Sequence, residues 1–170
     1  MVLPDCTPMG ERRHALPGSA LVGHAFVRGM PERHVDRLAA VARYEDVPAG
    51  HRFFEEGKSA DRFWLIQAGR VCLDLRVPGR GTVIVESLGR GTVLGWSWLF
   101  PPYEWRFGAV AAEPVRAIML DARAVREMCA EDPALGYELT RRFTAIMLDR
   151  LQNTRMRLLD LYGAPSGRDV

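Results

Sequence analysis

The 170-residue sequence is poor in the side chains on which metal and thiol chemistry depend. It contains four histidines and three cysteines, and no C-x-x-C, H-x-H or H-x-x-x-H motif occurs. Such spacings are typical of zinc sites and redox motifs, so we expect no metal site and no required cofactor. Cys6, Cys72 and Cys129 are odd in number and far apart, which predicts no disulfide framework and favours a reducing cytoplasm.

No nucleophile–base–acid set is recognisable either. The acidic pairs Glu55–Glu56 and Glu131–Asp132 are interpreted as a turn and a helix end. A cupin-type enzyme would need a cage of inward-pointing imidazoles, but all four histidines precede the main strands. We therefore expect no enzyme and keep the cupin reading only as a distant alternative.

Long apolar runs and an excess of one charge are also missing. No run of 18 apolar residues occurs, so no membrane span is expected. The net charge is +2 and Lys58 is the single lysine, so no broad basic face for nucleic acid is indicated. Proline and glycine interrupt the N-terminal region, which predicts no signal peptide and a flexible tail over residues 1–22. The Gly/Pro-containing residues 164–170 are expected to be disordered.

The residues that are present predict a helix, then a series of strands, then helical structure again. Residues 31–44 carry Pro31 at a helix start and apolar side chains on one face, which indicates an amphipathic helix. Between residues 44 and 121, short alternating runs are separated by glycine turns. In residues 71–77 valine and leucine alternate with Cys72, Asp74 and Arg76, which is typical of a half-buried strand. Seven or eight such strands predict a sandwich or small barrel.

The C-terminal part predicts two helices. Residues 122–132 favour a short helix that stops before Pro133, and about thirty proline-free residues follow. One stripe on this long helix has steps of three and four, as in a heptad seam. The seam consists of Tyr137, Thr140, Thr144, Met147, Leu151, Thr154, Leu158 and Leu161, and a second stripe consists of Leu135, Leu139, Phe143 and Ile146. We expect the seam to form a homodimer, the alternative being that both stripes bury in one domain.

Several segments together resemble the cyclic-nucleotide-binding domain of the Crp/Fnr class. They are VPAGHRFFEEGKSADRFWLIQAGRVCL, GRGTVLGWSWLF, RFGAVAAEPVRAIMLD and RLQNT. The resemblance implies a jelly roll with flanking helices over residues 23–132 and a long dimerisation helix over residues 133–163. Transcription factors of this class continue into a helix-turn-helix domain. This chain ends at Val170, so the expectation is a stand-alone module that does not bind DNA directly.

The resemblance also implies a ligand site, because relatives hold the cyclic phosphate with an arginine and with backbone N–H groups of a short helix. Arg106 matches that arginine in position, Gly95 and Leu99 match the glycine and leucine of the short helix, and Thr154 matches a purine-contacting threonine. The candidate ligand-binding residues are Gly95, Trp96, Ser97, Trp98, Leu99, Arg106, Phe107, Gly108 and Thr154.

The match departs from the family at decisive positions. Trp96 stands where relatives place a glutamate for the ribose hydroxyl, and Phe107 and Gly108 stand where Ser or Thr and then Ala are expected. An indole donates one hydrogen bond and accepts none, so Trp96 cannot replace the glutamate.

Three interpretations of residues 94–111 therefore stay open. The site binds a cyclic nucleotide (cAMP or cGMP) through Arg106; or it binds another anion with an apolar body; or the aromatics fill the pocket and Arg106 pairs internally, with Glu104 or Glu86. Under the first two, the chain is a non-catalytic sensor that signals through its dimer helix to an unknown protein partner. Under the third, it is a ligand-free interaction scaffold.

Overall fold

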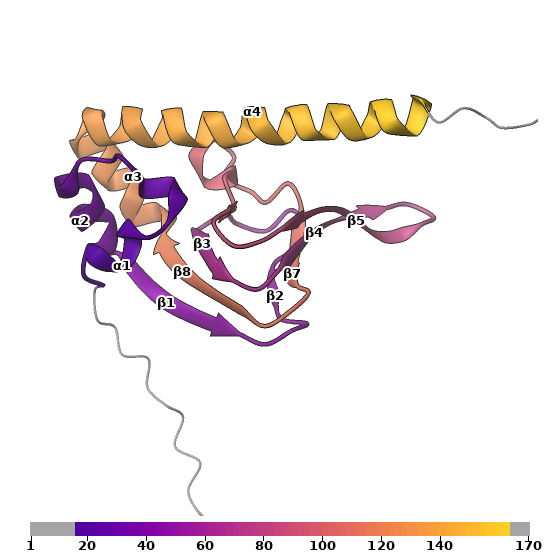
Figure 1. Cartoon of the computed structure of the whole chain (residues 1–170), viewed down its shortest axis with the longest axis horizontal. Coiled ribbons are helices and arrows are strands. Elements are labelled where there is room, and N and C mark those ends of the chain that lie inside the picture. The colour runs from indigo at the N-terminus through magenta and orange to yellow at the C-terminus, as the bar shows by residue number, and fades with distance from the viewer. Residues whose placement is uncertain (1–15, 164–170) are drawn as a thin grey trace, which may run out of the picture.

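The structure, a computed structural model, describes residues 16–163, and side chains up to residue 160. Within these residues eight strands form two antiparallel four-stranded sheets, with strand orders β1-β8-β3-β6 and β2-β7-β4-β5 (Figure 1). The strands are β1 (Ala42–Val47), β2 (Arg52–Phe54), β3 (Arg62–Ala68), β4 (Val71–Val77), β5 (Gly81–Leu88), β6 (Val93–Leu94), β7 (Gly108–Ala111) and β8 (Val115–Asp121). The predicted jelly-roll class is confirmed.

Helices flank this roll at both ends of the chain, and one short helix, η2, lies between β6 and β7. They are α1 (Ser19–Val22), η1 (Ala25–Val27), α2 (Glu32–Ala40), η2 (Ser97–Leu99), α3 (Ala122–Glu131) and α4 (Pro133–Gly163). The expected tail over residues 1–22 is wrong in its last part, because Leu21 in α1 is fully buried in the core. Residues 1–15 and 164–170 lie outside the described residues.

The β4–β5 hairpin shows how local sequence sets the strands. Gly79 and Gly81 adopt φ of +75° and +76°, a conformation that L side chains rarely take, and the chain reverses there. Leu73 of β4 lies in the core, and the neighbouring Cys72 is buried as well, so the first part of the strand is more than half-buried. Asp74 on the same strand is also buried, because it pairs with Arg52 at 2.8 Å.

The long helix α4 packs on the domain through one of its two predicted stripes. Leu135, Leu139 and Phe143 are fully buried, and Phe143 lies edge-on against the ring of Trp98 at 5.4 Å. In contrast, Tyr137 of the seam is 71% exposed. All of residues 151–160 are exposed, and Figure 1 shows α4 continuing along the roll toward the β4–β5 hairpin. The reading in which both stripes bury in one domain therefore does not hold.

No helix in residues 16–163 combines the length and the apolar character that crossing a bilayer requires.

Candidate ligand pocket

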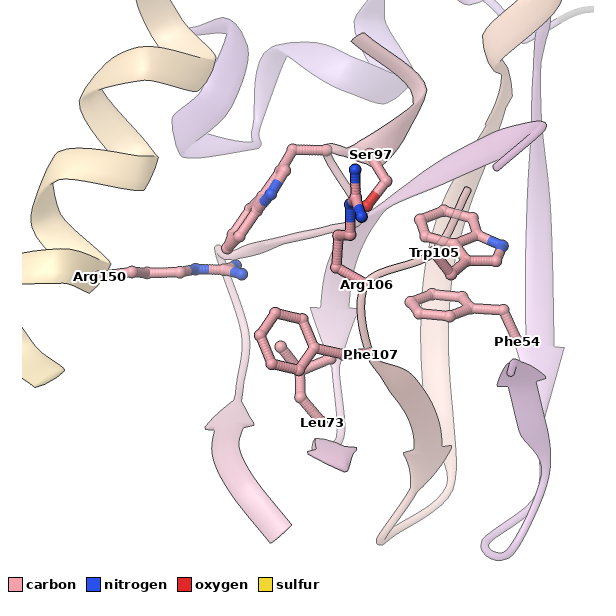
Figure 2. Close-up of a pocket in the computed structure, with 9 residues that line it drawn as sticks. Phe54, Leu73, Ser97, Trp105, Arg106, Phe107 and Arg150 are labelled. Atoms are coloured by element: carbon pink, nitrogen blue, oxygen red, sulfur yellow. The ribbon is translucent and has the colours of Figure 1, made fainter. Parts of the chain in front are cut away.

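A small pocket lies where the segment between β6 and β7 folds over the inner face of the roll (Figure 2). The segment contains η2, and it brings most of the predicted aromatic residues to one place. The lining residues are Phe54, Leu73, Gly95, Trp96, Ser97, Trp105, Arg106, Phe107 and Arg150. They come from β2, β4, the 95–107 segment and α4, so the pocket depends on the complete fold.

Two aromatic rings stack on each other in the pocket. Phe54 and Trp105 lie with ring centroids 3.7 Å apart and planes 11° from parallel. The indole of Trp105 also lies directly against Gly95, since a Cβ there would come within 2.8 Å of the ring. Gly95 has φ of +92°, so both the backbone conformation and the space require glycine at this position.

Arg150 enters the pocket from α4, opposite the Phe54–Trp105 stack in the view of Figure 2. Its guanidinium carbon lies 4.5 Å from the centre of the Trp96 ring, in cation–π geometry. It also donates a hydrogen bond to the carbonyl of Val93 and lies 3.6 Å from a carboxylate oxygen of Glu86. Burial lowers the pKa of Arg150 from its ordinary value, and the charge of Glu86 opposes that shift. Arg150 therefore links α4 to β6, to β5 and to the 95–107 segment.

Arg106 lines the same pocket but stays exposed, with its side chain drawn near Ser97 in Figure 2. No carboxylate of residues 16–160 lies within 4.0 Å of its guanidinium. The predicted internal pairs with Glu104 and Glu86 are thus not formed, and Glu86 is close to Arg150 instead.

The free cavity volume among these side chains is about 20 Å³. A volume of this size holds about one water molecule. Ligand pockets for small organic molecules usually measure about 300–1,000 Å³. In this conformation the free volume is far below that range, and four of the nine lining residues are aromatic.

Five of the nine predicted site residues line the pocket, and four do not. Gly95, Trp96, Ser97, Arg106 and Phe107 are in it. Trp98 is instead fully buried in the hydrophobic core, where it stacks on Phe63 at 4.9 Å. Leu99 also packs against that core, being half-buried.

Gly108 and Thr154 have other structural roles. Any side chain at Gly108 would collide with the Arg52–Asp74 ion pair, so this glycine makes room for that pair. Thr154 is exposed, and its hydroxyl donates to the carbonyl of Arg150 one turn earlier.

Sequence reasoning missed four lining residues, which are Phe54, Leu73, Trp105 and Arg150. For Arg150 a signal was available, because it opens the RLQNT segment that was used to select Thr154. The step of four residues between them places both near one helix face.

Comparison with known proteins gives consistent results. The family model "Cyclic nucleotide-binding domain" matches residues 44–132. A Mycobacterium tuberculosis protein named "CRP-like cAMP-activated global transcriptional regulator" is 30% identical over 116 residues, which are 68% of this chain and 50% of the relative. The chain thus spans about half the length of the curated relatives that it matches.

Solved structures show the same fold. A Geobacter metallireducens protein of the cyclic nucleotide-binding class superposes with a TM-score of 0.72 at 28% identity, covering 79% of this chain and 97% of that chain. The Thermus thermophilus catabolite activator protein gives a TM-score of 0.63 at 22% identity, covering 81% of this chain and 62% of that chain.

Proposed function

Because the chain belongs to the cyclic nucleotide-binding domain family, we propose that it is a non-catalytic regulatory module whose pocket is filled by its own side chains. In this proposal the module works as a homodimer through α4, and it needs no cyclic nucleotide to hold α4 against the roll. It acts on a protein partner rather than on DNA, since its net charge of +2 offers no broad basic face.

The single observation that carries the proposal is the cavity volume of about 20 Å³ beside Arg106. The stacked pair Phe54–Trp105 and the Trp96 ring beneath Arg150 occupy the pocket. Opening it for a nucleotide would break the cation–π contact and expose aromatic surface, and both changes cost free energy. Trp96 also offers no acceptor for a ribose hydroxyl.

The seam of α4 supports the homodimer. Leu151 and Leu158 are about half exposed, and they continue a stripe that begins at Tyr137. Within residues 151–160 a weak contact of Arg157 with the carbonyl of Val85 joins the helix to the roll, and packing of an apolar face is what stabilises such a helix end in water. A second copy presents the same seam, so two copies can bury it by coiled-coil packing.

The test combines nucleotide titration with a measurement of mass. We expect no saturable quenching of tryptophan fluorescence by cAMP or cGMP up to millimolar concentration, and a dimer by light scattering coupled to size exclusion. Saturable quenching that Arg106→Ala abolishes would overturn the filled pocket, whereas a monomer at micromolar concentration would overturn the homodimer. The two halves of the proposal can therefore fail separately.

A second candidate function rests on Arg106 itself. Its exposed guanidinium has no carboxylate within 4.0 Å among residues 16–160, and Arg150 brings a second cation to the same pocket. These features favour a sensor for an anion with an apolar body, which would displace an aromatic ring on binding. Titration with aromatic and aliphatic carboxylates separates the two functions, since only the sensor predicts quenching that depends on Arg106.

A further inference from the structure

A polar hollow of about 460 Å³ lies at one end of the β1-β8-β3-β6 sheet, beside the start of α3. It shares no lining residue with the aromatic pocket, and the proposed function makes no use of it. Its lining residues are Arg43, Ser59, Asp61, Arg62, Met119, Asp121, Arg123 and Arg126.

The sheet register places two of these arginines on one face. Arg43 of β1 pairs with Met119 of β8, and Arg62 of β3 pairs with Asp121 at the end of β8. Cross-strand partners point to the same side, as do residues two apart on one strand. Arg43 and Arg62 therefore face the same side of the sheet from strands on either side of β8.

Helix α3 adds two more guanidinium groups to the hollow. Arg126 is held in place, because it donates to the carbonyl of Trp98 at 3.0 Å and lies 4.5 Å above the ring of Tyr103. Neither contact neutralises its charge. Arg123 lies nearer the N-terminus of α3 and pairs with the exposed Glu127 at 3.3 Å.

The carboxylates in the hollow leave an excess of positive charge. Asp61 lies 3.3 Å from Arg62, and Asp121 accepts the backbone N–H of Ala124 at the start of α3. The half-buried Arg43 has no carboxylate within 4.0 Å among residues 16–160. Four guanidinium groups therefore face two carboxylates, one of which already caps a helix.

We propose that this hollow binds an anion that carries phosphate groups. A phosphate group presents several oxygens to several donors, and the planar guanidinium fork matches that geometry. Arg43 and Arg62 approach from the sheet and Arg126 from α3, so a bound phosphate meets donors from two directions. A pyrophosphate or phosphomonoester suits the volume and charge better than a single carboxylate.

The experiment uses the full chain with pyrophosphate and inorganic phosphate as probes, measured by titration calorimetry at two ionic strengths. We expect saturable binding that weakens with added salt, with pyrophosphate tighter than phosphate. Arg43→Gln should weaken pyrophosphate binding about tenfold, since it removes a charge-assisted contact. Asp61→Asn should tighten it about two- to fivefold, because a competing carboxylate is lost.

Two arginine variants elsewhere act as matched controls. Arg70→Gln changes an exposed ion pair with Glu113, and Arg116→Gln on β8 changes an exposed ion pair with Asp46 on β1. Neither should alter pyrophosphate binding. The proposal is overturned by the absence of saturable binding, by equal losses in Arg43→Gln and either control, or by weaker binding in Asp61→Asn. Thermal unfolding of each variant without ligand establishes that Arg43→Gln still folds.

Discussion

The two halves of α4 are in contrasting environments although they form one continuous helix. Up to Arg150, the helix packs against α3 and buries Leu135, Leu139 and Phe143 completely, with Phe143 against Phe26 of η1. After Arg150, residues 151–160 are all exposed, including Leu151 and Leu158. The first half is part of the domain core, whereas the apolar residues of the second half are about half exposed or more among the residues that the structure describes.

This difference separates the part of α4 that stabilises the fold from the part that is available for association. The first half obtains its stability from packing, and the second half extends beyond it as a continuation of the same backbone hydrogen bonds. Arg150 marks the border, because it is the last buried side chain of α4 up to residue 160, with 9% of its surface exposed. Changes before the border should affect folding, and changes after it should affect association.

The largest effect is expected before the border, at Phe143. Phe143→Ala removes a ring that contacts Phe26, Phe63 and Trp98, and it should lower the free energy of unfolding by about 3–5 kcal/mol. Urea denaturation followed by tryptophan fluorescence measures this loss. The exposed Arg155→Ala is the control, and an equal loss there would contradict the division of α4.

The next largest effect lies after the border. Leu151→Glu combined with Leu158→Glu places charge on the seam, and it should weaken the proposed dimer by about a hundredfold or more, from two lost apolar contacts. Light scattering over a dilution series measures the change. Gln152→Glu, which lies off the seam, should leave the mass unchanged; a double variant that stays dimeric would place the interface elsewhere.

A smaller effect is expected at the border itself. Arg150→Gln and Trp96→Leu each remove the cation–π contact, and a double-mutant cycle should give a coupling of about 0.5–2 kcal/mol. The amides of residues 151–160 should also exchange hydrogen faster in Arg150→Gln. Arg155→Gln should leave both measurements unchanged, and a coupling near zero would show that Arg150 is held by Val93 and Glu86 alone.

The smallest effect concerns pH at the start of α4. The backbone N–H of Leu135 is the main cause that lowers the pKa of Asp132, with help from Ala134, His34 and Arg37. A lowered carboxyl pKa means that its stabilisation is complete above the ordinary carboxyl range and is lost as pH falls below it. The free energy of unfolding should therefore differ less between pH 6 and pH 3 in Asp132→Asn than in the wild type, as measured by urea denaturation at both pH values. Asp160→Asn should keep the full difference.

The elements and their order could be predicted because their signals are local. Glycines at the turns separate the strands, Pro133 separates α3 from α4, and the step of three and four residues defines both stripes of α4. The buried stripe was also foreseen from its spacing. The sequence did not show where the first element begins, since Leu21 is buried by tertiary contacts that no local pattern reveals.

Matching the family by position predicted only part of the site, because Leu99 and Thr154 match it and yet lie outside the pocket. Arg106 and Gly95 line the pocket as expected, whereas Trp98 points into the core from the same short segment. Which face of η2 a side chain takes depends on the packing of Phe63 and Phe143, which is not visible in the motif. Trp105 and Arg150 were missed for the same reason, because stacking and cation–π contacts join residues far apart in sequence.

The length of α4 beyond Arg150, residues 151–160, means that a small rotation of the helix produces a larger displacement at its end. At 1.5 Å per residue, the ten residues 151–160 extend about 15 Å beyond Arg150, and a long contact from Arg157 to the carbonyl of Val85 at 3.5 Å is their printed link to the roll. A rotation of about 10° at Arg150 displaces the far end by about 2.6 Å, by simple trigonometry on the same length. A small rotation of α4 at Arg150 therefore moves the far end of the helix much more than it moves the contact between Arg150 and the Trp96 ring.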